Sequence, residues 1–159
     1  MHPDGLGFLY PEVDTDRCIG CGLCEQACPF RTDTPRRDAA TLPEVHAVRD
    51  KRREEMATSR SGAVFIALSD WILTQGGTVY GAGYADHFRV VHKRAATRKE
   101  RDEFKGSKYV QSDPGNVFTQ VRTDLEQGRH VLFSGTPCQT AGLRSVLDLR
   151  HAPTEKLWL

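Results

Sequence analysis

The feature that most constrains this chain is a cluster of cysteines near its start. Four cysteines and a proline follow the pattern C-x2-C-x2-C-x3-C-P, at Cys18, Cys21, Cys24, Cys28 and Pro29. This is the bacterial ferredoxin run for a 4Fe–4S cluster. Thiolates two residues apart on a tight loop suit the corners of a cubane, and Gly20 and Gly22 let the backbone approach the sulfides. We therefore predict that these thiols bind iron and sulfide and do not pair as disulfides.

Two questions about this segment stay open in the sequence. A zinc site, as in a structural zinc-knuckle protein, is the alternative metal centre, although zinc sites usually separate two cysteine pairs by a longer loop. In two-cluster ferredoxins the fourth cysteine of each run ligates the other cluster, and this chain has one run. Either Cys28 completes the cluster, or the fourth ligand is Cys138, a solvent molecule or a partner chain. We favour four local ligands.

Composition narrows the classes of partner. The 159 residues include 22 Lys and Arg against 21 Asp and Glu, a formal net charge of +1. Such a balance gives no basic field for binding nucleic acid. The longest apolar run, residues 63–68, is far shorter than the about 20 residues of a membrane span, and the first residues resemble no secretory signal. We expect a cytoplasmic protein with no nucleic-acid partner and no membrane span.

Differences in composition along the chain predict its organisation. Residues 31–43 are polar, contain two prolines and show no apolar period, which is typical of a linker. We divide the chain into a ferredoxin-type segment (1–35), a linker (36–48), a partial α/β domain (49–148) and an irregular tail (149–159). The mixed-sign run 49–55 is expected to be a solvated helix face or loop.

The second region alternates helical and extended patterns. Apolar residues predict a helix from Ser61 to the glycines at 76 and 77, with Val64, Phe65, Leu68, Trp71 and Ile72 on its inner face. Strands are expected at 78–84 and 88–92, paired as a hairpin, and at 130–133. Two further features are a capping box from Thr97 to Glu100 and an N-cap at Asp113 before Pro114.

The next helix should bury Val117, Val121 and Leu125, and a last helix should run from the Gly135 region to Leu147. Strands that alternate with helices predict an α+β or α/β fold. The sequence therefore predicts a small ferredoxin-like segment followed by an incomplete α/β domain.

Several strings in the chain resemble the coenzyme F-420 hydrogenase/dehydrogenase beta subunit family. They are DGLGFLYP (4–11), SRSGAVF (59–65), GGTVYG (76–81), KGSKYVQS (105–112) and FSGTPCQ (133–139). The resemblance implies an iron–sulfur flavoprotein oxidoreductase, in which FAD lies beside the cluster and coenzyme F-420 or another two-electron acceptor is the substrate. It also implies a redox partner protein or subunit.

The resemblance assigns roles to residues outside the cysteine run. Cys138 is the candidate catalytic residue. The candidate cofactor-binding residues are Ser61, Gly62, Ser107, Lys108, Tyr109, Gly135, Thr136 and Pro137. Their chemistry is suitable, because the last three precede a helix whose amides and dipole favour a phosphate, while a lysine and an aromatic ring suit a nucleotide. Among the histidines, His87, His92 and His130 are interpreted as turn or strand-edge residues.

A different class of function is the alternative. The chain ends about twenty residues after Gln139, whereas the family domain continues further, so a ferredoxin-like electron carrier or a non-catalytic fragment needing a partner chain is also possible. A missing half-domain would leave Leu143, Val146 and Leu147 poorly covered.

Overall fold

The computed structural model describes residues 2–30 and 44–159, so most of the predicted linker lies outside the described residues. A four-stranded mixed sheet forms the centre of the described part, in the order β4-β3-β5-β6. Its strands are β3 (Thr78–Tyr84), β4 (Val90–Ala95), β5 (Val131–Phe133) and β6 (Leu157–Trp158). A separate N-terminal hairpin consists of β1 (His2–Pro3) and β2 (Leu9–Tyr10).

The helices alternate with these strands. In chain order they are α1 (Leu23–Ala27), α2 (Arg53–Thr58), α3 (Val64–Thr74), α4 (Arg98–Arg101), α5 (Val117–Glu126) and α6 (Pro137–Leu149). Short 3-10 turns lie at η1 (Ser61–Ala63), η2 (Asp86–Phe88) and η3 (Asp102–Phe104). The mixed α/β class predicted from the sequence is confirmed by this element order.

β3 is the central strand. It pairs antiparallel with β4, as the predicted hairpin requires, and parallel with β5, which in turn pairs parallel with β6. Successive side chains of β3 alternate between the two faces of the sheet, so Val79 and Tyr80, both fully buried, enter different cores.

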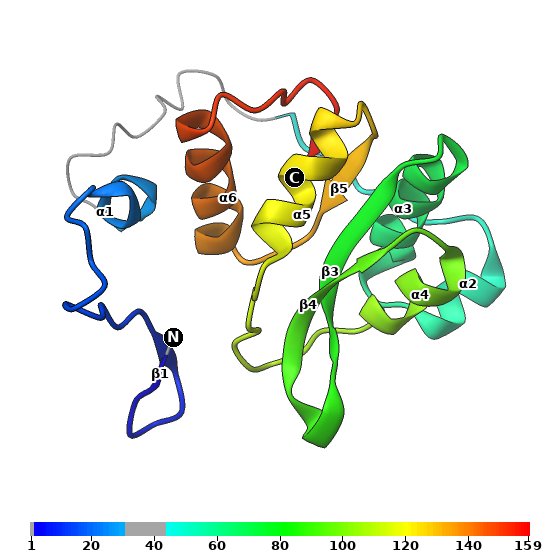
Figure 1. Cartoon of the computed structure of the whole chain (residues 1–159). Coiled ribbons are helices and arrows are strands. Elements are labelled where there is room, and N and C mark those ends of the chain that lie inside the picture. The colour runs from blue at the N-terminus through cyan, green and yellow to red at the C-terminus, as the bar shows by residue number, and fades with distance from the viewer. Residues whose placement is uncertain (1, 31–43) are drawn as a thin grey trace.

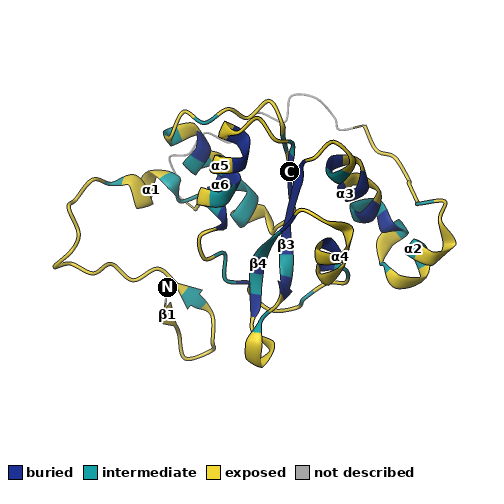
Figure 2. Cartoon of the chain, turned by 45° about the vertical axis from the view of Figure 1, so that its right-hand side comes forward, coloured by how far each residue is buried: buried dark blue, intermediate teal, exposed yellow. Residues whose placement is uncertain are grey.

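Helices cover both faces of the sheet, which gives three layers (Figures 1 and 2). On one face α5 and α6 form a core of Tyr80, Val117, Val121, Leu125, Val131, Phe133, Leu143 and Leu147. On the other face α3 and η3 form a core of Ile72, Val79, Ala95, Phe104 and Leu132. The predicted inner stripe of α5 is therefore confirmed.

The C-terminal region differs from its prediction. Leu143 and Leu147 are completely buried, because α6 packs against α5 and the sheet, so this apolar surface is covered. The tail is not irregular throughout either, since α6 continues to Leu149 and the two residues of β6 join the sheet beside β5. Ala152 adds to the core between them.

Two local predictions are also wrong. Leu68 and Trp71 are 48% and 44% exposed, and the buried face of α3 contains Ser69 and Asp70 in their place. Trp71 instead meets Trp158 edge to face, with ring centroids 4.9 Å apart. Asp113 does not cap α5: its carboxylate accepts the Gly115 amide at 2.9 Å, and the helix begins three residues later than expected.

The N-terminal segment lies against the second region at two places. The backbone of Leu9 exchanges hydrogen bonds with the Gln111 side chain, at 2.7 Å and 3.2 Å. Further along the chain, α1 packs beside α6 (Figure 1). The cysteine run is thereby placed next to the three-layer domain.

A buried carboxylate ties α5 to the sheet. Asp124, 4% exposed, accepts hydrogen bonds from the hydroxyls of Thr78 (2.8 Å) and Tyr80 (2.7 Å) and pairs with Arg94 (2.8 Å) and Arg129 (3.2 Å). Burial raises the pKa of this carboxyl, but the bonds from Arg94, Tyr80 and Thr78 lower it more, so its net pKa lies below the ordinary value. The native state therefore holds Asp124 as the anion.

This network predicts the effect of Asp124→Asn. The change leaves Arg94 without its buried counter-charge, and we expect a loss of about 3 kcal/mol in the free energy of unfolding. The depressed pKa means that the wild-type contribution is complete above the ordinary Asp pKa of about 4 and is lost as pH falls through the lower native value. Urea denaturation of both proteins as a function of pH measures this effect.

The matched control is Asp148→Asn, because that aspartate is exposed on α6. Its unfolding free energy should stay within about 0.5 kcal/mol of wild type. Equal stability of Asp124→Asn and Asp148→Asn at neutral pH would contradict the structural role of the network.

Candidate functional site

The cysteine run occupies a loop and a short helix. Cys18 and Cys21 lie in the loop, Cys24 lies within α1, and Cys28 ends that helix, donating its backbone N–H to the Glu25 carbonyl at 3.2 Å. Gly20 and Gly22, flanking Cys21, have φ values of 66° and 70°, the left-handed region that favours glycine. The glycines thus allow the tight loop that this spacing needs.

The chemistry of these donors fits an iron–sulfur cluster. All four thiols are free; three are exposed and that of Cys28 is half-buried. Within residues 2–30 and 44–159, no three His, Cys, Asp or Glu side chains lie close enough together to hold a metal ion. Ligation therefore requires the four thiols to converge, and an exposed loop with two flanking glycines is suited to that adjustment. The residues that would hold the cluster are Cys18, Cys21, Cys24 and Cys28.

A cavity of about 790 Å³ is the second feature of the site. Segments that are far apart in the sequence line this cavity. They are the loop before β2, residues 59–66, strands β3 and β4, residues 104–112, and the start of α6. The loop after β5 lines it because Ser134 donates its amide to the Tyr80 carbonyl at 2.9 Å, beyond the parallel pairing of β3 and β5. The cavity thus lies at the carboxyl end of this parallel pair.

Most of the residues that the family resemblance singles out line this cavity. They are Ser61, Ser107, Lys108, Tyr109, Gly135, Thr136 and Cys138. Cys138 is exposed, and its sulfur lies 3.1 Å from the Thr136 hydroxyl. The structure therefore brings these residues together, and their roles in binding or catalysis remain predictions.

Gly62 and Pro137 are not part of the cavity wall, and each has a structural task. A Cβ at Gly62 would lie 2.5 Å from the Val48 carbonyl oxygen, and its φ is 76°, so the backbone conformation there requires glycine. Pro137 is at the start of α6, where its missing N–H is tolerated. Neither residue needs a ligand to explain it.

Two cations that line the cavity, Arg60 and Lys108, have no carboxylate partner among the described ion pairs. Lys108 donates to the carbonyls of Glu103 (2.9 Å) and Lys105 (3.0 Å) and lies 5.7 Å from the centre of the Tyr84 ring. Burial lowers its pKa, with partial compensation from the charge of Glu103. Lys108 can therefore donate to an anion in the cavity.

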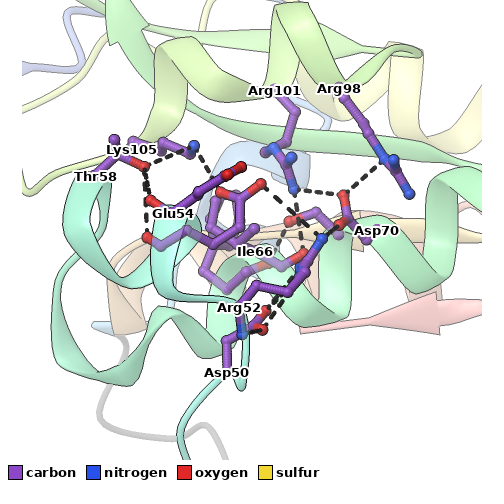
Figure 3. Close-up of polar contacts among 12 residues, drawn as sticks. Asp50, Arg52, Glu54, Thr58, Ile66, Asp70, Arg98, Arg101 and Lys105 are labelled. Atoms are coloured by element: carbon purple, nitrogen blue, oxygen red, sulfur yellow. Dashed lines mark hydrogen bonds and ion pairs between the residues drawn. The ribbon is translucent and has the colours of Figure 1, made fainter.

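The neighbouring Lys105 is already neutralised. Its ammonium lies 2.8 Å from Glu55 and 3.3 Å from Asp102 and donates to the Thr58 hydroxyl at 3.2 Å. Burial lowers the pKa of Lys105, but these partners raise it more. Its contacts connect α2 to the loop at 105–109, which lines the cavity (Figure 3).

A buried cluster of one carboxylate and three arginines holds neighbouring segments together on this side of the cavity. Asp70 of α3, 8% exposed, pairs with Arg52 at 2.6 Å, Arg101 at 3.0 Å and Arg98 at 3.2 Å (Figure 3). Arg101 is 1% exposed and also donates to the Ile66 carbonyl at 3.2 Å. Three segments are thus held around one carboxylate, which fixes the backbone on one side of the cavity.

The sequence analysis assigned no binding or catalytic role to several polar residues of the cavity wall, among them His92, Ser112 and Gln139. His92 lies on β4, the edge strand of the sheet, as expected, but its ring is buried: it is 7% exposed and stacks on Phe133 with 5.2 Å between the ring centroids. The sequence did contain a signal for the burial of His92: side chains of a strand alternate between its faces, so His92 shares a face with the apolar Val90.

Comparison with known proteins agrees with the cysteine motif. The family model of the 4Fe-4S binding domain, Fer4, matches residues 11–32. The chain is thus an iron–sulfur protein, and the match supports an electron carrier. Among curated proteins, no sequence matches this chain. No helix of the described part has both the length and the apolar character to cross a membrane.

The identity of the fourth ligand leads to a prediction. After anaerobic reconstitution, we expect wild type to hold about four iron atoms per chain and Cys28→Ser clearly fewer, with an altered visible spectrum, because a thiolate ligand is lost. Cys138→Ser is the matched control and should keep the wild-type iron content. The reverse pattern, normal iron in Cys28→Ser and loss in Cys138→Ser, would identify the distant cysteine as the ligand.

Proposed function

We propose that this chain is an iron–sulfur flavoprotein component that passes electrons between its 4Fe–4S cluster and a flavin bound in the 790 Å³ cavity. The observation that supports it most is the convergence of separate segments on one cavity. Two of them are the predicted loops at 107–109 and 135–138, and a third is the N-terminal segment, which contributes Phe8. The flavin would therefore sit against the same segment that carries the cysteines.

The cavity suits a large cofactor with an aromatic ring and a phosphate. Its volume is within the range of small-molecule sites, about 300–1,000 Å³, and its position at the carboxyl ends of parallel strands is where α/β sheets bind ligands. Phe65, Ile66 and Phe104 supply an apolar wall for a ring. Lys108 supplies a cation for a phosphate.

The proposed electron path follows α6. This helix begins at the cavity and packs beside α1, which carries Cys24, and its 13 residues span about 20 Å. An iron–sulfur cluster exchanges one electron at a time, whereas a flavin exchanges two with a hydride-type acceptor. Coenzyme F-420 is the two-electron substrate that the family resemblance suggests, and a redox partner protein would serve the cluster.

A simpler electron carrier is the second candidate. It is favoured by the extent of the family match, which covers only the ferredoxin-type segment. On this alternative the cavity binds no flavin, and the three-layer domain serves to dock a partner chain.

Reconstitution separates the two candidates. Anaerobic incubation with iron, sulfide and FAD, followed by gel filtration, should leave both the cluster chromophore and about one flavin per chain on the protein. Photoreduction of the bound flavin should then be followed by reduction of the cluster, seen by electron paramagnetic resonance. A normal cluster with no retained FAD or FMN would leave the simple carrier as the function.

The role of Lys108 gives a second test. Lys108→Gln should weaken FMN binding about 10-fold, because a charge-assisted hydrogen bond to phosphate is lost. Riboflavin has no phosphate, so its affinity should be the same in both proteins. Lys99→Gln, an exposed lysine of α4, is the control. Equal weakening of FMN and riboflavin would contradict a phosphate contact; isothermal titration calorimetry provides the affinities.

A further inference from the structure

A continuous chain of hydrogen bonds crosses one wall of the cavity. Gln139 of α6 donates from Nε2 to the Ser112 hydroxyl oxygen at 2.9 Å, and that hydroxyl lies 2.8 Å from Nδ1 of His92. The other ring nitrogen of His92, Nε2, lies 3.1 Å from the Ser134 carbonyl oxygen. All of these residues line the cavity, and Ser112 and His92 are each 7% exposed.

Backbone groups at the two ends fix the direction of every bond in this chain. The Thr136 amide can only donate, so Gln139 faces it with Oε1, at 2.9 Å, and faces Ser112 with its NH₂. The Ser134 carbonyl can only accept, so Nε2 of His92 carries a proton. Nδ1 of the neutral ring is therefore an acceptor, and the Ser112 hydroxyl donates to it.

This arrangement leaves Ser112 able to receive a proton from the cavity. A hydroxyl oxygen has two lone pairs, one of which accepts from Gln139, and its own hydrogen points to the base His92. Burial lowers the pKa of the imidazole, and the bond to the Ser134 carbonyl offsets this in part, so the ring is neutral near pH 7. His92 is thus ready to accept a proton through Ser112.

The charged group nearest to His92 on its face of β4 is already paired. Arg94 follows on the same face of β4 and pairs with Asp124 of α5. Tyr80 of β3 and Asp113 before α5 are titratable groups on segments that pair with β4, and Cys138 of α6 lies in the same cavity wall. In the described residues no carboxylate forms an ion pair with His92, so Ser112 is the partner of its free nitrogen.

We propose that Ser112 and His92 form a proton relay for the flavin in the cavity, an inference that rests on the proposed function. If the bound flavin is in its anionic two-electron-reduced form, its oxidation releases one ring proton; Ser112 Oγ would take that proton and pass its own proton to Nδ1 of His92. The two electrons leave one at a time through the cluster to a one-electron acceptor. The imidazolium then releases its proton to solvent, and reduction runs the same path in reverse.

The first test is a histidine titration by NMR on the full chain. The pKa of His92 should lie below the ordinary value of about 6.5. Ser112→Ala should raise it, because the hydroxyl stabilises the neutral ring, and oxidised FAD should lower it further by removing solvent from the wall. A His92 pKa unaffected by both changes would overturn the relay.

The second test is the pH profile of flavin oxidation. Reduced protein with bound FAD is mixed with ferricyanide in a stopped-flow instrument between about pH 4 and pH 8, a range that includes the ordinary histidine pKa and the region below it. The wild-type rate should rise with pH through the pKa of His92, since only the neutral ring accepts a proton. His92→Asn keeps an acceptor for Ser112 but takes up no proton, and should be about 100-fold slower with no inflection.

Two further variants separate a relay from a structural role. The double variant Ser112→Ala/His92→Asn should be no slower than either single variant, because residues that act as one unit are not additive. His87→Asn, an exposed histidine of η2, should keep the wild-type profile.

The outcomes distinguish the two proposals. If wild type binds FAD and His92→Asn keeps the wild-type rate and inflection, the relay is wrong and the flavin site stands. If wild type binds neither FAD nor FMN, the proposed function fails, and the relay fails with it.

Discussion

The parallel pairing of β5 with β3 is the constraint on which the rest of this structure depends. Because β3 also pairs with β4, one strand sets the position of both neighbours: Tyr80 receives the amide of Ser134 beyond β5, and Ala82 lies opposite His92 of β4. Helices then cover both faces of the sheet. The cavity follows from this pairing, since β3 brings the loop after β5 and the inner face of β4 together beside Gly81 and Ala82.

Charge pairs, together with the apolar contacts of Phe65 and Phe104, hold the segments around the cavity. An unpaired buried carboxylate costs several kcal/mol, so Asp70 and Asp124 require the arginines that surround them. Asp70 thereby fixes the approach to α2, whose Glu55 holds Lys105 at the border of the cavity. Lys108 lies near this charge network, lines the cavity and is partly exposed.

Local signals explain what the sequence predicted correctly. The bounds of β3, the capping box at Thr97 and the buried stripe of α5 depend on residues within one turn or one strand of each other. The exposure of Trp71 and the burial of Asp70 depend on partners far along the chain, Trp158 and Arg101, which no local period contains. β6 is likewise defined only by its pairing with β5. For the site, sequence strings identified most of the lining residues but not His92, whose hydrogen-bond partners come from two separate loops.

The positions of the proposed electron route and the proposed proton route suggest how the two transfers would be coupled. Electrons would leave the cavity at the start of α6 toward α1, whereas protons would leave through the wall formed by Ser112 and His92. Both routes share one element, because Gln139 of α6 also donates to Ser112. A shift of this helix would therefore alter the hydroxyl that receives the proton as well as the distance to the cluster. Linking both routes to one rigid helix would make single-electron transfer at the cluster sensitive to proton transfer at the flavin.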